Sequence, residues 1–256
     1  MIFTRLKLFL IKNRYKKIRK IGADFEKIYK ASVFCDTLKS LKDKFDGQRC
    51  FLIGNGPSLK TEDLEKITDE YSFSCNKIYK AFDKTNFRPC FYIVDDYALV
   101  KEDYENIIKV PSRETFVCLE YGKKLLKKYE KSDVKVLLKK RENSNGFPMP
   151  SRNLDEYVGG GHTVLFPAYQ IAVQMGFKEI ILLGVDCSFK NNGGNWFYKD
   201  NKKIPSSAED GVRRAFEMIR QDADKRGIKV YNATRGGELE IFKRVDLDEV
   251  LRREDK

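Results

Sequence analysis

The chain has 256 residues, 41% of them hydrophobic, which is enough to bury a sizeable core and excludes a disordered protein. Six scattered cysteines without a C-x-x-C pair, and a single histidine, argue against a zinc site and favour free thiols in a reducing compartment. The net charge of +12 is concentrated at the start, because residues 1–49 carry fourteen Lys and Arg against five Asp and Glu.

Residues 1–20 contain eight Lys and Arg and no acid, with apolar side chains between them on roughly one face of a helix. The apolar run is too short to span a bilayer, and Lys12 ends it too early for a signal peptide. The pattern favours a basic amphipathic helix on an anionic membrane surface, with a solvated helix that packs on the protein as the alternative. Nucleic acid is not an expected partner, because the basic residues accompany no known reading motif.

A helical pattern continues over residues 23–45, and the turn signal Asp46-Gly47-Gln48 follows it. We therefore predict a boundary near residue 47. Residues 1–46 would form the basic amphipathic helical segment, and residues 47–256 would form one catalytic domain.

The segment over residues 49–60 reads as a buried strand, a tight polar turn and the start of a helix. Gly54 and Gly56 permit a positive φ or a close approach to a ligand, and Asn55 and Ser58 place short polar side chains where open α/β sheets bind ligands. The spacing matches neither G-x-G-x-x-G nor a Walker loop, so the turn is a candidate ligand loop without a standard fingerprint.

Short apolar runs alternate with helical segments along the rest of the chain. This alternation predicts an α/β fold, a single Rossmann-like domain with a mostly parallel sheet and helices on both faces. One run delivers Asp95 and Asp96 at its carboxyl end, and another ends in Asp186. The predicted strands lie at residues 51–53, 71–75, 91–94, 115–119, 134–138, 179–186 and 229–231.

Residues 139–161 contain many breakers and few strand signals, so we expect a long loop over the ligand edge of the sheet. His162 and Thr163 then open a helix. Residues 188–207 are polar with three aromatic residues set among them, which predicts either a lid that closes on a ligand or a loop pinned to the body. The aromatic residues are Trp196, Phe197 and Tyr198.

Five blocks follow one another in the chain: IGNGPSL at 53–59, NKIY at 76–79, the segment 163–180, GVD at 184–186 and NATRGG at 232–237. This ordered set resembles the 6-hydroxymethylpterin diphosphokinase (MptE-like) family, whose members are often associated with bacterial surface-polysaccharide synthesis. The first four blocks are also similar to the Campylobacter-type sialyltransferases, which share the fold and use CMP-activated sugars. The resemblance covers roughly residues 49–245 and leaves out the basic N-terminal segment.

The resemblance implies a nucleotide site at the strand ends. The residues after the first strand would lie near phosphate and ribose, with Asn76 on the nucleotide, Thr163 and its neighbours at the base, and Asp186 under the lid. Tyr198 or Trp196 would take the place of a lid contact. A CMP-sugar needs neutral donors around its phosphate, shelter for an oxocarbenium-like transition state and a base for the acceptor hydroxyl. The implied nucleotide-binding residues are Gly54, Asn55, Gly56, Ser58, Asn76, Thr163 and Tyr198.

The catalytic base is open between three candidates, Asp96, Asp186 and His162. Each has a structural alternative: an exposed turn acid, a helix or loop anchor, and an N-cap partner, respectively. The resembling families place a histidine after the aspartate or in and after the lid, where this chain has Cys187 and no histidine. Asp95 and Asp96 lack the D-x-D spacing of metal-binding glycosyltransferases, so we expect no metal ligands.

Three functions remain open. The favoured one is a glycosyltransferase that moves a sugar from a CMP-type donor to a glycan or lipid-linked acceptor in bacterial surface polysaccharide or lipooligosaccharide synthesis. It would need no further cofactor and would be cytoplasmic, peripheral on the inner face of the inner membrane. The second is a 6-hydroxymethylpterin diphosphokinase-like phosphotransferase, which would need cationic clamping of ATP and usually magnesium. The third is a non-catalytic nucleotide-binding protein of a glycan assembly complex; homo-oligomerisation is also left open.

Overall fold

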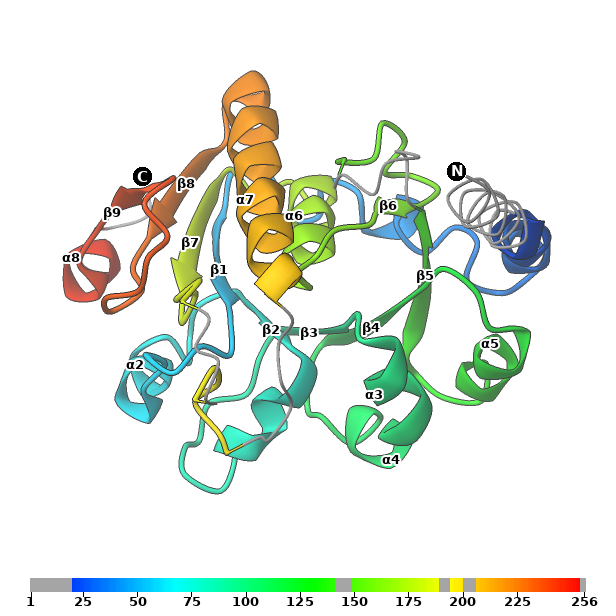
Figure 1. Cartoon of the computed structure of the whole chain (residues 1–256), viewed down its shortest axis with the longest axis horizontal. Coiled ribbons are helices and arrows are strands. Elements are labelled where there is room, and N and C mark those ends of the chain that lie inside the picture. The colour runs from blue at the N-terminus through cyan, green and yellow to red at the C-terminus, as the bar shows by residue number, and fades with distance from the viewer. Residues whose placement is uncertain (1–19, 141–148, 189–193, 200–205, 254–256) are drawn as a thin grey trace, which may run out of the picture.

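The structure, a computed structural model, describes residues 20–140, 149–188, 194–199 and 206–253 (Figure 1). The predicted basic helix over residues 1–20 lies outside the described residues except for Lys20, and the predicted lid over residues 188–207 lies partly outside them.

One sheet runs through the described chain, and every neighbouring pair of its strands is parallel. The strand order is β6-β5-β4-β3-β2-β1-β7-β8-β9. This confirms the predicted α/β class and the parallel sheet. The strands are β1 Arg49–Ile53, β2 Ser72–Cys75, β3 Phe91–Val94, β4 Glu114–Leu119, β5 Lys135–Lys140, β6 Val158–Gly159, β7 Glu179–Leu183, β8 Lys229–Asn232 and β9 Lys243–Arg244.

Strand β1 marks the point where the direction of the strand order reverses. From β1 the chain proceeds outward through β2 to β6, returns to place β7 on the other side of β1, and continues to β8 and β9. Ile53 at the end of β1 pairs with Ser74 of β2 and with Leu183 of β7, so these three strands end at one edge. Loops that leave such a reversal diverge, and the crevice between them is where open α/β sheets bind ligands.

Helices cover both faces of the sheet (Figure 1). Alternate β1 residues face opposite cores, with Cys50 and Leu52 on one side and Phe51 and Ile53 on the other, as the two-residue strand period requires. Helices α6 and α7 pack on the first side, and the helix over residues 20–30 packs with α2 to α5 and α8 on the second. The helices are α2 Thr61–Lys66, α3 Tyr97–Glu102, α4 Tyr104–Ile107, α5 Lys123–Tyr129, α6 Leu165–Gln174, α7 Ser206–Arg226 and α8 Leu247–Leu251, with 3-10 helices η1 Lys39–Leu41 and η2 Asn76–Ala81.

The predicted helix over residues 23–45 is shorter than expected, because it ends at residue 30 and turns with η1 follow. Ser32 supplies the local reason: its hydroxyl donates to the carbonyl of Tyr29 at 2.7 Å and accepts from the amide of Phe34 at 3.3 Å. A serine that bonds nearby backbone in this way competes with helix continuation.

The described part of the predicted N-terminal segment packs on the sheet domain. Phe25 and Tyr29 are buried, and the Tyr29 hydroxyl donates to the carbonyl of Val136 in β5 at 3.1 Å. The amide of Phe45 donates to the carbonyl of Met175, just after α6, at 2.7 Å. The boundary near residue 47 stays a prediction, but residues 20–46 share both cores of the domain that follows.

The loop over residues 139–161 contains strand β6, which the sequence did not predict. Buried Gln170 of α6 holds this strand, because its side-chain oxygen accepts from the amides of Ser151 and Gly159, each at 2.8 Å. Its amide nitrogen donates to the carbonyl of Gly159 at 3.1 Å.

No helix in the described part of the chain combines the length and the apolar character that a membrane span requires.

Candidate functional site

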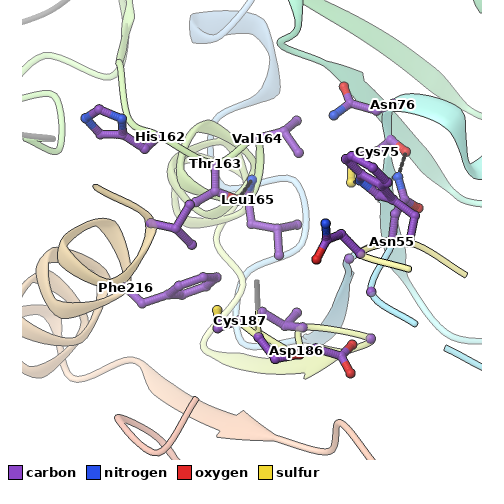
Figure 2. Close-up of a pocket in the computed structure, with 18 residues that line it drawn as sticks. Asn55, Cys75, Asn76, His162, Thr163, Val164, Leu165, Asp186, Cys187 and Phe216 are labelled. Atoms are coloured by element: carbon purple, nitrogen blue, oxygen red, sulfur yellow. Dashed lines mark hydrogen bonds between the residues drawn. The ribbon is translucent and has the colours of Figure 1, made fainter. Parts of the chain in front are cut away.

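A cavity of about 240 Å³ lies at the carboxyl edge of the sheet, where β1 and β7 diverge (Figure 2). We call it the switch-point cavity. Its walls come from the loops after β1, β2 and β7, the first turn of α6, one face of α7 and a short piece of residues 194–199. The described residues that line it are Gly54, Asn55, Gly56, Cys75, Asn76, His162, Thr163, Val164, Leu165, Gly184, Val185, Asp186, Cys187, Ser188, Asn195, Trp196, Val212 and Phe216.

The structure brings most of the residues singled out from the sequence to this cavity, but not all of them. Asp96 and Tyr198 line a second cavity, and Ser58 lies behind the lining, bonded to Asp186. The residues that meet at the switch-point cavity are Gly54, Asn55, Gly56, Asn76, His162, Thr163 and Asp186.

Asp186 is the buried acid of the switch-point cavity, with 7% of its surface exposed. Its Oδ2 accepts from the hydroxyl of Ser58 at 2.8 Å and from the amide of Ser58 at 3.4 Å. Ser58 therefore anchors the carboxylate that faces the site, and these two donors are already engaged before any phosphate arrives.

Gly54 and Gly56 are required for a different reason from the one expected. Neither has a positive φ. A Cβ on Gly54 would lie 2.5 Å from the carbonyl oxygen of Gly184, and a Cβ on Gly56 would lie 1.9 Å from Oδ2 of Asp186. Glycine thus lets the β1 loop lie directly against the β7 loop, and the close approach is to protein.

Asn55 links the loops after β1 and β2. Its Nδ2 donates to the carbonyl of Cys75 at 2.9 Å. Its Oδ1 is buried with no hydrogen-bond partner among the described residues. An unpaired buried acceptor costs about 1–3 kcal/mol of stability. A ligand hydroxyl or amine can donate to this oxygen and so remove the cost, whereas an ionised phosphate has only acceptors and cannot. The oxygen is covered in this structure, so a ligand reaches it only if the amide turns.

Two non-glycine residues at the cavity have left-handed backbone, Asn76 with φ 46° and Cys187 with φ 51°. Such positions are rare outside glycine and cluster at ligand sites. Asn76 is held on both sides, because the Tyr92 hydroxyl donates to its carbonyl and the amide of Asp95 donates to its Oδ1 at 3.4 Å. The sequence signal for this strain was Asn itself, the non-glycine residue that tolerates the left-handed region best.

His162 and Thr163 lie at the start of α6 but act differently. Thr163 Oγ1 accepts from the amide of Leu165 at 3.3 Å, a local bond across Val164, the N-cap residue of α6. His162 is exposed at the rim and packs on α7, where a Cβ on Gly211 would lie 2.5 Å from its ring. In Figure 2 its ring is on the opposite side of α6 from Asp186.

A second cavity of about 430 Å³ adjoins the first. The two share Asn76 and Trp196 in their linings. Asp96 lines the second cavity and caps α3, because its Oδ1 accepts from the amide of Ala98 at 2.9 Å. The described lining residues are Asn76, Lys77, Asp96, Ala98, Leu99, Glu102, Asp103, Trp196 and Tyr198.

The sequence matches the 6-hydroxymethylpterin diphosphokinase MptE-like family over residues 23–192. This chain belongs to that family. The match confirms the family of the resemblance but gives it other bounds, because it begins within the predicted N-terminal segment and ends before the NATRGG block. It covers β1 to β7 and hence the loops that carry Asn55, Asn76 and Asp186, while α7, β8 and β9 lie beyond it.

A solved structure, the MAf glycosyltransferase from Magnetospirillum magneticum AMB-1, has a fold similar to this MptE-like chain, with a TM-score of 0.53 at 16% sequence identity. The alignment covers 89% of the MptE-like chain and 39% of that protein, so the chain spans well under half of its length. At this identity the likeness shows the fold alone. No curated protein matches the sequence significantly.

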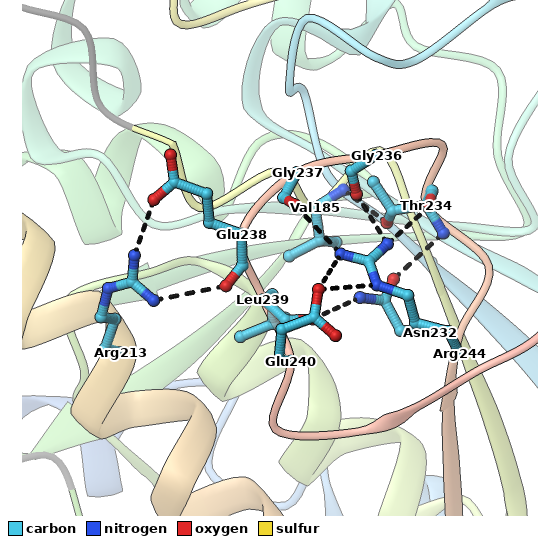
Figure 3. Close-up of polar contacts among 10 residues, drawn as sticks. All are labelled: Val185, Arg213, Asn232, Thr234, Gly236, Gly237, Glu238, Leu239, Glu240 and Arg244. Carbon is cyan, nitrogen blue, oxygen red and sulfur yellow. Dashed lines mark hydrogen bonds and ion pairs between the residues drawn. The ribbon is translucent and has the colours of Figure 1, made fainter.

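Residues 232–240 of the MptE-like chain support the loop that carries Asp186 (Figure 3). The hydroxyl of Thr234 accepts from the amide of Val185 at 3.0 Å, and the amide of Glu238 donates to the carbonyl of Asp186 at 2.6 Å. A Cβ on Gly237 would lie 2.7 Å from Cα of Asp186. The NATRGG block and the residues after it therefore hold Asp186 in position. The sequence did not reveal this role, because it depends on contacts between residues about fifty positions apart.

Three arginines fix this support, two of which are drawn in Figure 3. Arg244 donates to the carbonyls of Thr234 at 3.1 Å and Gly236 at 2.7 Å. Arg213 of α7 pairs with Glu238 at 3.0 Å, so the long helix is tied to the same loop. Buried Asp63 of α2 holds the guanidinium of Arg235 through two bonds of 2.7 Å.

A buried ion pair lies farther along the same sheet edge. Lys139 Nζ is 2.5 Å from Asp95 and 3.4 Å from Glu120. Burial raises the pKa of Asp95 from 3.8 to about 6, and the charge of Lys139 opposes that rise. Asp95 is thus a structural acid beside Asn76, whereas its neighbour Asp96 faces the second cavity.

The described residues 194–199 are attached to the loop after β1, because the amide of Phe197 donates to the carbonyl of Asn55 at 3.0 Å. Lys77 and Lys80 of η2 have their ammonium groups 6.0 and 5.9 Å from the centre of the Tyr198 ring. Closure of a lid over residues 188–207 stays a prediction. The described residues form no group of three or more His, Cys, Asp or Glu side chains that could hold a metal ion.

Proposed function

We propose that this MptE-like protein is a glycosyltransferase that uses a nucleotide-activated sugar of the CMP type. The observation that carries the proposal is the polarity of the switch-point cavity. Its described polar side chains are neutral amides, hydroxyls and an imidazole around one buried carboxylate, Asp186. The ribose and the base of a nucleotide supply hydroxyl and amine donors to such acceptors. CMP and ATP share these groups, so the distinction lies in the phosphates: a triphosphate brings more negative charge to Asp186 than the single phosphate of a CMP-sugar does.

The proposed reaction moves the sugar in one displacement. The oxygen of the acceptor hydroxyl bonds to the anomeric carbon while the bond from that carbon to the phosphate oxygen breaks, and CMP leaves with the electron pair. The hydroxyl proton passes to a carboxylate, for which Asp186 in the first cavity and Asp96 in the second are the candidates. His162, at the rim and against α7, is the weaker candidate.

We place the acceptor among surface glycans or lipid-linked glycans. The support is the basic segment over residues 1–20, which the sequence predicts to lie on an anionic membrane surface. The fold neighbour named as a glycosyltransferase adds that a sheet of this kind can host sugar transfer.

A diphosphokinase is the second candidate, because the family is named for 6-hydroxymethylpterin diphosphokinase. It requires ATP with a divalent cation and cationic groups around the transferred phosphates. In the described lining of the switch-point cavity, the charged side chain is the carboxylate of Asp186, which repels a polyphosphate placed beside it.

Isothermal titration of the full chain with CMP, UMP, GDP and ATP, each with and without Mg²⁺, separates these functions. We expect CMP to bind with a Kd in the micromolar range, about −8 kcal/mol, without a requirement for Mg²⁺. Asn55→Ala should weaken CMP binding about threefold to tenfold, as expected for one neutral hydrogen bond of about 0.5–1.5 kcal/mol. The exposed Asn86→Ala is the matched control and should bind as the unaltered protein does.

Tighter binding of ATP with Mg²⁺ than of CMP would instead identify the diphosphokinase. CMP binding without release of CMP from a CMP-activated nonulosonate, with a glycan acceptor present, would support the non-catalytic nucleotide-binding protein. Failure of all four nucleotides to bind would refute the proposed site.

A further inference from the structure

The second cavity differs from the switch-point cavity in both charge and surface. Three of its lining side chains are carboxylates, one is a lysine and two are aromatic. Its volume of about 430 Å³ falls within the range of about 300–1,000 Å³ that is typical of small-molecule sites. The charged and aromatic lining residues are Asp96, Glu102, Asp103, Lys77, Trp196 and Tyr198.

We propose that the second cavity binds a neutral sugar unit of the acceptor glycan. That this sugar belongs to the acceptor rests on the proposed glycosyltransferase function, whereas the binding of a neutral carbohydrate rests on the residues that line the cavity. The two ligands would then meet at the shared wall of Asn76 and Trp196.

The aromatic pair gives the cavity an apolar face. The rings of Trp196 and Tyr198 lie nearly parallel, 6.1 Å apart with an angle of 19° between their planes. Lys77 and Lys80 lie near the Tyr198 ring, and Phe197 between the two aromatic residues is bonded to Asn55, so the pair is held in position. The negative face of an aromatic ring attracts partly positive hydrogens, which the C–H faces of a sugar ring present.

The carboxylates give the cavity hydrogen-bond acceptors for sugar hydroxyls. An ionised carboxylate accepts at about four lone-pair sites, so one that caps a helix or bonds a neighbour still has sites for a ligand. Asp96 accepts from two amides of α3, and Asp103 accepts from Tyr79 and from Asn106. These bonds fix two of the acids in place before any ligand binds, which reduces the ordering entropy that binding costs.

The charge of the cavity selects between neutral and anionic ligands. Three carboxylates outnumber the single lysine of the lining, so a phosphate or a sugar acid placed there meets net repulsion. A neutral hexose meets none, and it donates hydroxyl protons to the acids. The anionic donor therefore meets less repulsion in the first cavity, whose described lining carries one carboxylate, and the neutral acceptor sugar fits the second.

The test is saturation-transfer NMR on the full chain with three probes: methyl β-glucopyranoside, methyl β-galactopyranoside and methyl β-glucuronide, each with and without CMP. At least one neutral glycoside should receive saturation with a Kd of about 10 mM or tighter. The glucuronide should bind roughly tenfold more weakly than the glucoside, which corresponds to about 1.4 kcal/mol. Equal binding of the glucuronide and the glucoside would contradict the role given to the carboxylates.

Three variants tie the signal to this cavity. Ala98→Trp fills the second cavity without touching the first and should abolish glycoside binding while CMP binding is unchanged. Lys101→Trp is the matched control, exposed on the same helix and outside the lining, and should bind glycosides normally. Glu102→Gln keeps the shape and removes one negative charge, so it should strengthen binding of the glucuronide.

The outcomes separate this inference from the proposed function. If neither neutral glycoside binds, or if Ala98→Trp and Lys101→Trp behave alike, the carbohydrate site is refuted even when CMP binds. If glycosides bind in an Ala98-dependent way and CMP does not, the carbohydrate site stands and the proposed CMP donor is wrong.

Discussion

The contact between Gly56 and Asp186 is the sharpest test of the switch-point cavity. In Gly56→Ala the new Cβ would lie 1.9 Å from Oδ2 and 2.8 Å from Cγ of Asp186, and 2.7 Å from the carbonyl oxygen of Gly184. The carboxylate must move by about 1 Å to restore an allowed separation. That movement breaks its 2.8 Å bond from the hydroxyl of Ser58.

The expected loss of stability follows from these contacts. A hydrogen bond to a charged group contributes about 1.5–3 kcal/mol, and overpacking against backbone adds about 1–3 kcal/mol. We therefore expect Gly56→Ala to lower the free energy of unfolding by about 2.5–6 kcal/mol. CMP affinity should fall at least tenfold, about 1.4 kcal/mol, because the displaced carboxylate then occupies the cavity.

A double-mutant cycle in urea separates the two parts of the clash. In the Asp186→Ala background the carboxylate is gone, while the carbonyl of Gly184 still opposes the new Cβ. Gly56→Ala should then cost about 1–3 kcal/mol less than in the unaltered protein. Gly22→Ala, whose Cβ meets nothing within 4 Å, is the control and should not destabilise.

Equal costs of Gly56→Ala in the two backgrounds, within about 0.5 kcal/mol, would refute the contact as described. CMP binding that survives Gly56→Ala unchanged would remove Asp186 from the nucleotide site, whatever the effect on stability.

Three further predictions test the surroundings of the site. Asn76→Gly keeps the left-handed backbone and should weaken CMP binding in titration with little change in the free energy of unfolding. Asn76→Ala should weaken CMP binding and also lose about 1 kcal/mol or more of stability. Equal CMP binding by both variants and the unaltered protein would make Asn76 purely structural. Lys139→Met leaves the buried Asp95 carboxylate unpaired and raises its folded-state pKa above about 6, while the unfolded value of 3.8 is unchanged, so the added loss of stability is small below about pH 6 and grows as pH rises above it. Urea unfolding should show a loss that is up to about 2.7 kcal/mol greater at pH 8 than at pH 5, and a pH-independent loss would contradict the pairing. The full chain should sediment with anionic vesicles and be released by high salt, because each Lys or Arg near the surface contributes about 1 kcal/mol of electrostatic binding that salt screens. A variant lacking residues 1–19 should stay in the supernatant. Equal sedimentation of the two proteins would assign membrane binding to another surface.

The sequence predicted the strands that are buried on both faces, because a parallel sheet between two helical layers needs continuous apolar runs. β1, β3 and β7 appear within a few residues of their predicted bounds. β6 and β9 were missed, since each is two residues long and pairs only at the edge of the sheet. Lys243 and Arg244 of β9 carry no apolar signal, and it is the donation by Arg244 to nearby carbonyls that holds them.

The sequence predicted which edge of the sheet carries the loops of the site, but not which residues of these loops contact each other. Parallel strands bring their carboxyl ends to one edge, so Asn55, Asn76 and Asp186 were expected near one another. The direct contact of Gly56 with Asp186 joins residues 130 positions apart and depends on the register of β1 with β7. Sequence reasoning therefore assigned Gly56 to a ligand, when its first neighbour is the acid itself.

Asp95 and Asp96 show how the end of a strand separates two identical side chains. Successive residues of an extended chain point to opposite sides, so the acid next to Val94 is turned into the protein beside Lys139 while the following one points outward and caps α3. Burial raises the pKa of Asp95, whereas Asp96 lines the second cavity. Only Asp96 is therefore placed to meet a substrate, yet Asp95 bonds Asn76 through its amide and so acts on the wall between the two cavities.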